Sequence, residues 1–207
     1  PLAEKTGLII PIGNWAINEA CRQLREWHLQ GHRNWSMAVN LSTLQFEQPS
    51  LVKTVLDCLE RHHLPPEMLI LEVTETTAMS NPDESVRVLT ELTDAGVKAS
   101  IDDFGTGYSS LLYLKRLPAC ELKIDRAFVK ELSGESEDAT IVSAIVALAK
   151  TLNLKVVAEG VETEAQQAFL TELGCNTLQG YLLGKPASAQ TIEALCARGE
   201  MLPGAEP

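Results

Sequence analysis

The sequence has no excess of positive charge and no long apolar run. Its 17 Lys and Arg residues stand against 28 Asp and Glu residues, so the formal net charge is −11. Proteins that bind duplex nucleic acid normally carry a basic face, and we therefore expect no duplex nucleic acid as a partner. The chain shows no signal peptide and no apolar stretch that could span a bilayer. These absences favour a cytoplasmic domain, which a longer parent protein could still anchor to a membrane upstream.

Two familiar motifs are also missing. The five cysteines are odd in number, lie far apart and form no CxxC pair, so we expect reduced thiols and no zinc site. No glycine-rich phosphate loop follows a first strand. This argues against an open Rossmann-like sheet, which is the main alternative to the fold considered below.

What the chain does have is a regular alternation of strand-like and helix-like segments. Hydrophobic residues make up 45% of the sequence and charged residues 22%, as in ordinary soluble globular proteins. The length of 207 residues allows one domain with a sizeable core or two small ones. We expect strands over residues 35–41, 69–74, 97–101, 121–125, 155–158 and 176–178, each followed by a helix. Such repetition favours an α/β fold with a parallel sheet.

The chain is organised around the stretch Ser100–Tyr108, in which two adjacent carboxylates end a strand. Neighbouring side chains of a strand point to opposite faces, so Asp102 and Asp103 can share one site only if the backbone leaves the strand between them. Gly105 and Gly107 make such a turn sterically easy. Because adjacent carboxylates repel unless a positive charge lies between them, a metal ion is the natural candidate. A solvated Asp-Asp turn is the alternative that this stretch alone leaves open.

Polar residues recur at or near the ends of the expected strands. They are Asn40, Glu72, Asp102, Asp103, Lys123, Asp125, Glu159 and Gln179. In a (β/α) barrel the active site lies at the carboxyl ends of the strands. The convergence of so many polar side chains on these positions favours a barrel of this type.

These segments resemble the signature blocks of the EAL domain, a bacterial family of cyclic di-GMP phosphodiesterases. The matching blocks are Val39-Asn40-Leu41-Ser42, Leu71-Glu72-Val73-Thr74-Glu75, Asp102-Asp103-Phe104-Gly105-Thr106-Gly107, Leu122-Lys123-Ile124-Asp125, Ala158-Glu159-Gly160-Val161-Glu162 and Gln179-Gly180-Tyr181. They follow the family's order from residue 1 to about Pro186. The resemblance implies a modified TIM-like (β/α) barrel and the hydrolysis of cyclic di-GMP to linear pGpG with two Mg²⁺ or Mn²⁺ ions.

The resemblance also implies a set of metal ligands. Asn40, Glu72 and Asp102 resemble the ligands of the first ion, and Asp102 resembles a bridge to the second, with Asp103 beside it. Asp125 resembles a group placed around the second ion and its waters. Hard oxygen ligands of this kind suit Mg²⁺ or Mn²⁺ better than zinc.

Further roles follow from the same resemblance. Lys123 resembles the residue that orients or activates the attacking water, and Glu159 is a second candidate for that role. Gln179 resembles a member of the water network around the second ion, and Pro186 resembles a position near a guanine. Glu75 resembles the residue that holds the 103–108 loop in position.

One departure from the family pattern concerns the amino terminus. The family is named for a Glu-Ala-Leu on its first strand, whose Glu binds metal and whose nearby Arg contacts phosphate. That strand would lie upstream of Pro1, and we interpret the Glu193-Ala194-Leu195 of the expected last helix as an accident of composition. We therefore expect an EAL-type domain over residues 1–198 without its first strand, followed by a flexible tail over residues 199–207.

The missing strand would have consequences for behaviour. It would remove one metal ligand and expose two strand edges, which invite pairing with another chain. We therefore expect the chain alone to bind cyclic di-GMP weakly, to hydrolyse it poorly and to associate, for example as a homodimer. In the parent protein we expect an upstream sensory or cyclase-like domain.

Other interpretations stay open at this point. One is a non-catalytic module that binds cyclic di-GMP or a protein partner. Another is a barrel lyase or aldolase that uses Lys123 as a Schiff base, which borohydride trapping would reveal. Glu162 and Glu164 also fit a capped, solvated helix start, and we favour that interpretation for Glu164.

Overall fold

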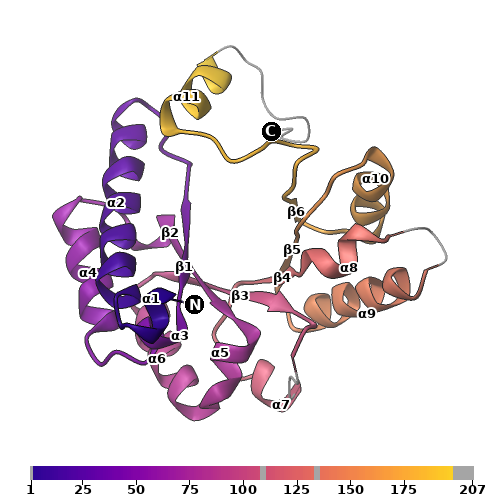
Figure 1. The fold of residues 1–207 in the computed structure, drawn as a ribbon, viewed down its shortest axis with the longest axis horizontal. Coiled ribbons are helices and arrows are strands. Elements are labelled where there is room, and N and C mark those ends of the chain that lie inside the picture. Colours follow the sequence, from indigo (N-terminus) through magenta and orange to yellow (C-terminus); the bar gives the residue numbers. More distant parts are fainter. Residues whose placement is uncertain (1, 108–110, 133–135, 198–207) are drawn as a thin grey trace. The chain divides into compact units, whose positions relative to one another are not determined.

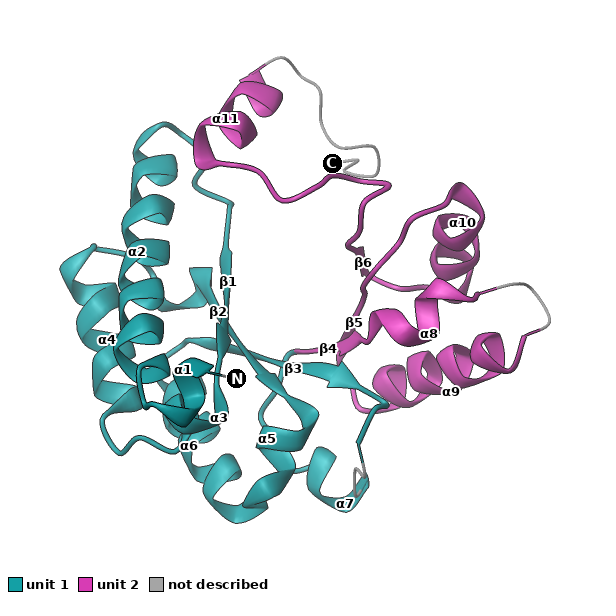
Figure 2. Cartoon of the chain, viewed as in Figure 1, with its two compact units in different colours: residues 1–120 teal, residues 121–207 magenta. Residues whose placement is uncertain are grey.

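The computed structural model describes residues 2–107, 111–132 and 136–197 (Figure 1). It divides into two compact units, residues 1–120 and residues 121–207, which Figure 2 colours separately. No described helix is long and apolar enough to cross a membrane.

Unit 1 contains three parallel strands, β1 (Met37–Leu41), β2 (Leu69–Thr74) and β3 (Lys98–Phe104). Leu69, Leu71 and Ile101 are fully buried on the two inner strands. The sequences of such buried strands consist mostly of consecutive apolar residues, as is typical of parallel sheets covered by helices. The core of unit 1 therefore lies along β2 and β3.

Helices connect and cover these strands. They are α1 (Leu2–Lys5), α2 (Ile9–Leu29), α3 (Thr43–Phe46), α4 (Leu51–Arg61), the 3₁₀ turn η1 (Pro66–Met68), α5 (Glu75–Ser80), α6 (Pro82–Asp94) and α7 (Leu111–Leu114). Asn81 caps the start of α6, where its side chain accepts a hydrogen bond from the Glu84 N–H. Ser42 and Gln45 form a capping box at the start of α3 that the sequence analysis did not identify.

Unit 2 also contains three parallel strands, β4 (Glu121–Ile124), β5 (Lys155–Ala158) and β6 (Thr177–Leu178). Its helices are α8 (Arg126–Lys130), α9 (Glu137–Thr151), α10 (Glu164–Leu173) and α11 (Ala189–Ala197). Thr163 and Gln166 form a capping box at the start of α10, and Gly174 ends that helix with a φ of 86°.

All six expected strands are present, with boundaries that differ by a few residues. The third strand continues to Phe104, and the fourth ends at Ile124 instead of Asp125. The short helices α3, α5 and α8 were not expected, because a single capped turn has too few residues to show a helical period. All five cysteines are free in the structure. The expected tail over residues 199–207 lies outside the described residues.

Gln166 connects three segments of unit 2 through one buried side chain. Its Oε1 accepts hydrogen bonds from the N–H groups of Glu162 (2.8 Å) and Thr163 (3.0 Å). Its Nε2 donates to the carbonyl oxygens of Val129 (3.0 Å) and Lys130 (3.2 Å) at the end of α8. The amide therefore satisfies donors and acceptors that would otherwise lack partners in a region with little water.

We predict that Gln166→Glu lowers the free energy of unfolding by about 1–3 kcal/mol. The introduced carboxylate can still accept hydrogen bonds from the two backbone N–H groups. It cannot donate a hydrogen bond to the carbonyl oxygens of Val129 and Lys130, so its oxygen would repel theirs. Urea unfolding followed by circular dichroism measures the change. Gln167→Glu is the matched control, since the neighbouring side chain is partly exposed; an equal loss in both variants would contradict the prediction.

Candidate active site

The register of unit 1 places its polar strand-end residues on one face of the sheet. Asn40 is opposite Glu72, and Glu72 is opposite Ser100. Asp102 lies two residues beyond Ser100 and so projects to the same side. Glu72 and Asp102 are each only 7% exposed, whereas Asn40 is exposed. Three of the predicted metal ligands therefore share a face of three adjacent strands.

Asp103 departs from regular strand geometry. Its φ of 53° is in the left-handed region, which non-glycine residues rarely adopt. Its N–H donates a 2.9 Å hydrogen bond to Oδ1 of Asp102. As a result, one carboxylate oxygen of each residue lies within 4.8 Å of the other. The backbone departure that the sequence predicted between the two aspartates is present.

Glu75 contacts the loop that follows these aspartates. It is the first residue of α5 and is 2% exposed. Its Oε2 accepts a 2.7 Å hydrogen bond from the Gly105 N–H. A Cβ placed on Gly107 would lie 3.0 Å from Oε1 of Glu75, so the loop packs closely over the carboxylate. Tyr108, at the end of the predicted loop, lies outside the described residues.

In unit 2 the predicted catalytic pair, Lys123 and Glu159, is joined directly. Nζ of Lys123 lies 2.7 Å from Oε1 of Glu159, with the Lys123 side chain 4% exposed and that of Glu159 19% exposed. The Glu159 N–H also donates to the Ile124 carbonyl oxygen at 3.1 Å. An ammonium this deeply buried needs such a partner, because an unpaired charge would be strongly destabilising.

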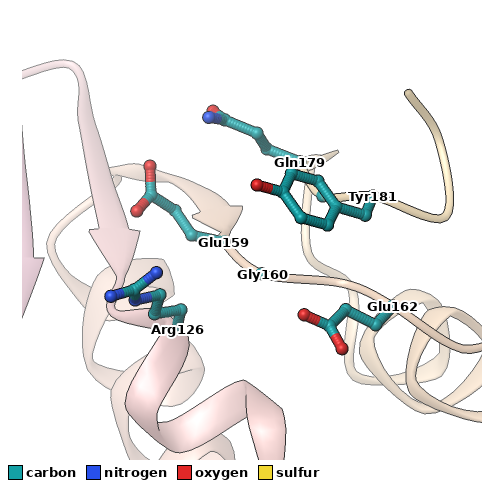
Figure 3. Close-up of a pocket in the computed structure, with 7 residues that line it drawn as sticks. Arg126, Glu159, Gly160, Glu162, Gln179 and Tyr181 are labelled. Atoms are coloured by element: carbon teal, nitrogen blue, oxygen red, sulfur yellow. The ribbon is translucent and has the colours of Figure 1, made fainter. Parts of the chain in front are cut away.

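Glu159 also lines a pocket of about 200 Å³ beyond the ends of β5 and β6 (Figure 3). The lining residues are Arg126, Glu159, Gly160, Glu162, Gln179, Gly180 and Tyr181. A Cβ placed on Gly160 would lie 2.6 Å from Cβ of Arg126, and one on Gly180 would lie 2.1 Å from the Val161 carbonyl oxygen. Both positions therefore require glycine for the pocket walls to approach each other.

Two further predicted site residues lie outside the strands and do not line this pocket. Asp125 was expected as the last residue of the fourth strand, over residues 121–125. It follows the strand instead, and its Oδ1 accepts a 2.6 Å hydrogen bond from the Ala127 N–H as the cap of α8. Pro186 is exposed in the segment between β6 and α11 and does not line the pocket.

Arg126 is the pocket residue that the sequence analysis missed. It follows Leu122-Lys123-Ile124-Asp125 directly and begins α8. The only sequence feature that could have indicated a role for Arg126 is its position directly after an aspartate that can cap a helix. That feature is weak, because a single Arg at such a position is usually solvated.

The donors of unit 1 fit a hard divalent cation. The predicted ligands Asn40, Glu72, Asp102 and Asp103 offer an amide oxygen and carboxylate oxygens, and the buried residues Glu72 and Asp102 lie on neighbouring strands. Such donors suit Mg²⁺ or Mn²⁺, whereas a zinc site would be expected to include His or Cys.

Parallel strands linked by helices, with polar residues at the strand ends, define a (β/α) protein whose site lies at the carboxyl edge of the strands. The profile of the EAL domain family matches residues 1–186. The chain belongs to this family, and the family predicted from the sequence is confirmed.

Named relatives support the assignment. The chain is 64% identical over 197 residues to the bifunctional diguanylate cyclase/cyclic di-GMP phosphodiesterase MucR of Pseudomonas aeruginosa, covering 95% of this chain and 29% of MucR. It is 46% identical over 192 residues to the cyclic di-GMP phosphodiesterase NbdA of the same organism, covering 93% of this chain and 24% of NbdA. The chain thus spans less than a third of the length of these relatives.

Solved structures agree on the fold. The PaMucR phosphodiesterase in complex with c-di-GMP has a TM-score of 0.91 and 65% identity, covering 93% of this chain and 78% of that one. The EAL domain of Mycobacterium smegmatis DcpA has a TM-score of 0.85 and 40% identity, covering 90% and 84%. The α/β fold class of the TIM-like (β/α) barrel type, predicted from the sequence, is confirmed.

We predict that Glu75→Ala exposes the Gly105 amide to hydrogen exchange and weakens Mn²⁺ binding, because the carboxylate no longer anchors the loop beside Asp102 and Asp103. Loss of a hydrogen bond to a charged group corresponds to about a tenfold effect or more. Glu75→Gln retains an acceptor and should preserve most of the protection. Mass-spectrometric hydrogen exchange and calorimetry measure both quantities; a change in thermal stability alone would leave Glu75 a purely structural residue.

Proposed function

We propose that the protein hydrolyses one phosphodiester of cyclic di-GMP to give linear pGpG, with two Mg²⁺ or Mn²⁺ ions. Relatives named as cyclic di-GMP phosphodiesterases and a neighbour solved in complex with c-di-GMP support this proposal. The observation that carries it is the placement of Asn40, Glu72 and Asp102 on one face of three adjacent strands. Such oxygen donors are the ones that a metal-dependent phosphodiesterase requires.

The proposed metal ligands of unit 1 are Asn40, Glu72, Asp102 and Asp103. When bound there, divalent ions would neutralise the nonbridging phosphate oxygens and lower the pKa of a bound water. Asp102 offers a second oxygen for bridging, and the unusual φ of Asp103 holds its carboxylate close by. We include Asp125 and Gln179 only as outer groups of the water network, since Asp125 already caps α8.

Lys123 and Glu159 have distinct proposed roles. A charged ammonium can donate hydrogen bonds but has no lone pair with which to accept a proton. The Glu159 carboxylate, 2.7 Å away, does have acceptor capacity. We therefore assign the orientation of the attacking water to Lys123 and proton acceptance to Glu159.

The wider context is proposed in the same way. We place the EAL-type domain within residues 1–198 and regard residues 199–207 as a tail. Because relatives such as MucR are much longer than this chain, the whole protein would carry a further sensory or cyclase-like domain. A cytoplasmic location and self-association as a homodimer complete the proposal.

Removal of a buried metal ligand provides a direct test. We predict that Glu72→Ala or Asp102→Ala lowers kcat for pGpG release by at least about a hundredfold at saturating Mn²⁺, because each change removes one anionic ligand. Chromatography of the products measures the rate. Asp94→Asn, at an exposed position of α6, should retain the parent rate. A near-normal rate in either ligand variant would refute the assignment.

Chelation distinguishes the proposal from Schiff-base chemistry. We predict that excess EDTA stops pGpG release and that added Mn²⁺ restores it, because the metal makes the nucleophile near neutral pH. Borohydride added during turnover should leave the mass of the Lys123 peptide unchanged. Metal-independent release with a trapped adduct on Lys123 would instead indicate a lyase.

A further inference from the structure

A chain of threonine hydroxyls connects the segments that follow β1 and β2. Thr77 of α5 is only 2% exposed. Its Oγ1 lies 2.6 Å from Oγ1 of Thr43, the first residue of α3. The same oxygen accepts a 2.9 Å hydrogen bond from the hydroxyl of Thr74, the last residue of β2. Because a hydroxyl has one donor and two acceptor positions, Thr77 can bond to both neighbours at once.

The hydroxyl chain lies just beyond the point at which the pairing of β1 with β2 ends. The last pair of that register is Leu41 with Val73, and the pair before it is Asn40 with Glu72. The hydrogen bond between α3 and α5 follows this last pair along both segments. It therefore extends the connection between the two strand ends past the backbone ladder, next to two of the proposed metal ligands.

The same hydroxyls determine where α5 begins. Oγ1 of Thr74 accepts a 3.3 Å hydrogen bond from the Thr77 N–H and so caps the helix. The helix spans only Glu75–Ser80, and a helix this short is not stable without such contacts. Its first residue, Glu75, accepts the 2.7 Å hydrogen bond from the Gly105 N–H. The contacts that fix the start of α5 therefore also fix the carboxylate that anchors the loop after β3.

Packing alone does not account for a hydroxyl at this buried position. Burying a hydroxyl costs free energy unless it is hydrogen-bonded. A valine has nearly the same shape and would fill the same space without a polar atom. What the threonine adds at position 77 is the pair of side-chain hydrogen bonds to Thr43 and Thr74.

We propose that Thr77 is a positioning residue for the metal site of unit 1. Through Thr43 its hydroxyl holds the end of β1, and with it Asn40, in place against the end of β2. Through the start of α5 it holds Glu75 in place beneath the loop. The inference rests on the proposed function, because it names a residue that arranges the proposed ligands without binding the ion itself.

Substitution of Thr77 by valine removes the hydroxyl and keeps the shape of the side chain. We expect Thr77→Val to weaken Mn²⁺ binding, measured by calorimetry, by about tenfold, because two hydrogen bonds are lost. Hydrogen exchange at the Gly105 amide, measured by mass spectrometry without metal, should become faster. Thr77→Ser restores the hydroxyl and should return both quantities to within about twofold of the parent chain.

Two further substitutions separate the hydroxyl chain from general stability. Thr43→Val, at an exposed position, breaks the bond to α5 but keeps its cap, so it should weaken Mn²⁺ binding and leave the exchange of Gly105 unchanged. Combined with Thr77→Val it should add nothing further, because both changes remove the same bond. Thr93→Val is the control: its hydroxyl donates to the Leu89 carbonyl oxygen at 2.9 Å within α6, and its loss should leave Mn²⁺ binding unchanged.

Several results would overturn this role of Thr77. Unchanged Mn²⁺ affinity in Thr77→Val, even with a lower thermal stability, would make the residue purely structural. Failure of Thr77→Ser to restore affinity would assign the effect to the methyl group, and equal weakening by Thr93→Val would assign it to general stability. If Thr77→Val does not fold, an unchanged Mn²⁺ affinity in Thr43→Val would overturn the connection to β1.

Because metal binding and hydrogen exchange are measured without substrate, the outcomes also separate this inference from the proposed function. If the variants follow the expected pattern but cyclic di-GMP is not hydrolysed, the positioning role stands and the proposed activity fails. If pGpG is released by the parent chain and by Thr77→Val with the same Mn²⁺ dependence, the activity stands and the positioning role fails. Absence of Mn²⁺ binding in the parent chain would overturn both.

Discussion

The parallel register of neighbouring strands is the constraint on which the site depends. Within unit 1 the pairing of Asn40 with Glu72, and of Glu72 with Ser100, places oxygen donors from separate segments of the chain on one face. A shift of one residue in either pairing would turn the donors of that strand to the opposite face. The apolar side chains between them, such as Leu71 and Ile101, fix the register because any shift would expose them. The strand register that buries the apolar core is therefore also the register that places the proposed metal ligands on one face.

The second constraint is that each buried charged side chain needs a compensating partner, and the two units supply different partners. In unit 2 the ammonium of Lys123 is neutralised by Glu159 within the chain. In unit 1 the carboxylates of Glu72 and Asp102 are each on residues only 7% exposed, and divalent cations are their proposed complement. Each arrangement avoids the penalty of an isolated buried ion. Glu75 differs again, since backbone N–H donation from Gly105 stabilises its carboxylate.

Much of this could be predicted from the sequence, and the limits have physical reasons. The short apolar segments that form the strands are local features, so the six strands were predicted within a few residues. Asp125 was placed on a strand because the apolar pattern does not show where β4 gives way to a cap. Arg126 was missed because its significance comes from the close approach of Gly160, a contact between positions far apart in the chain.

The net charge of the protein explains why the cations of the site are few and specific. A chain of net charge −11 repels an anionic dinucleotide at long range. Binding then requires a local reversal of sign, which bound divalent ions can supply over carboxylate ligands. At the pocket in unit 2, Arg126 is the cation among the lining residues, beside Glu159 and Glu162.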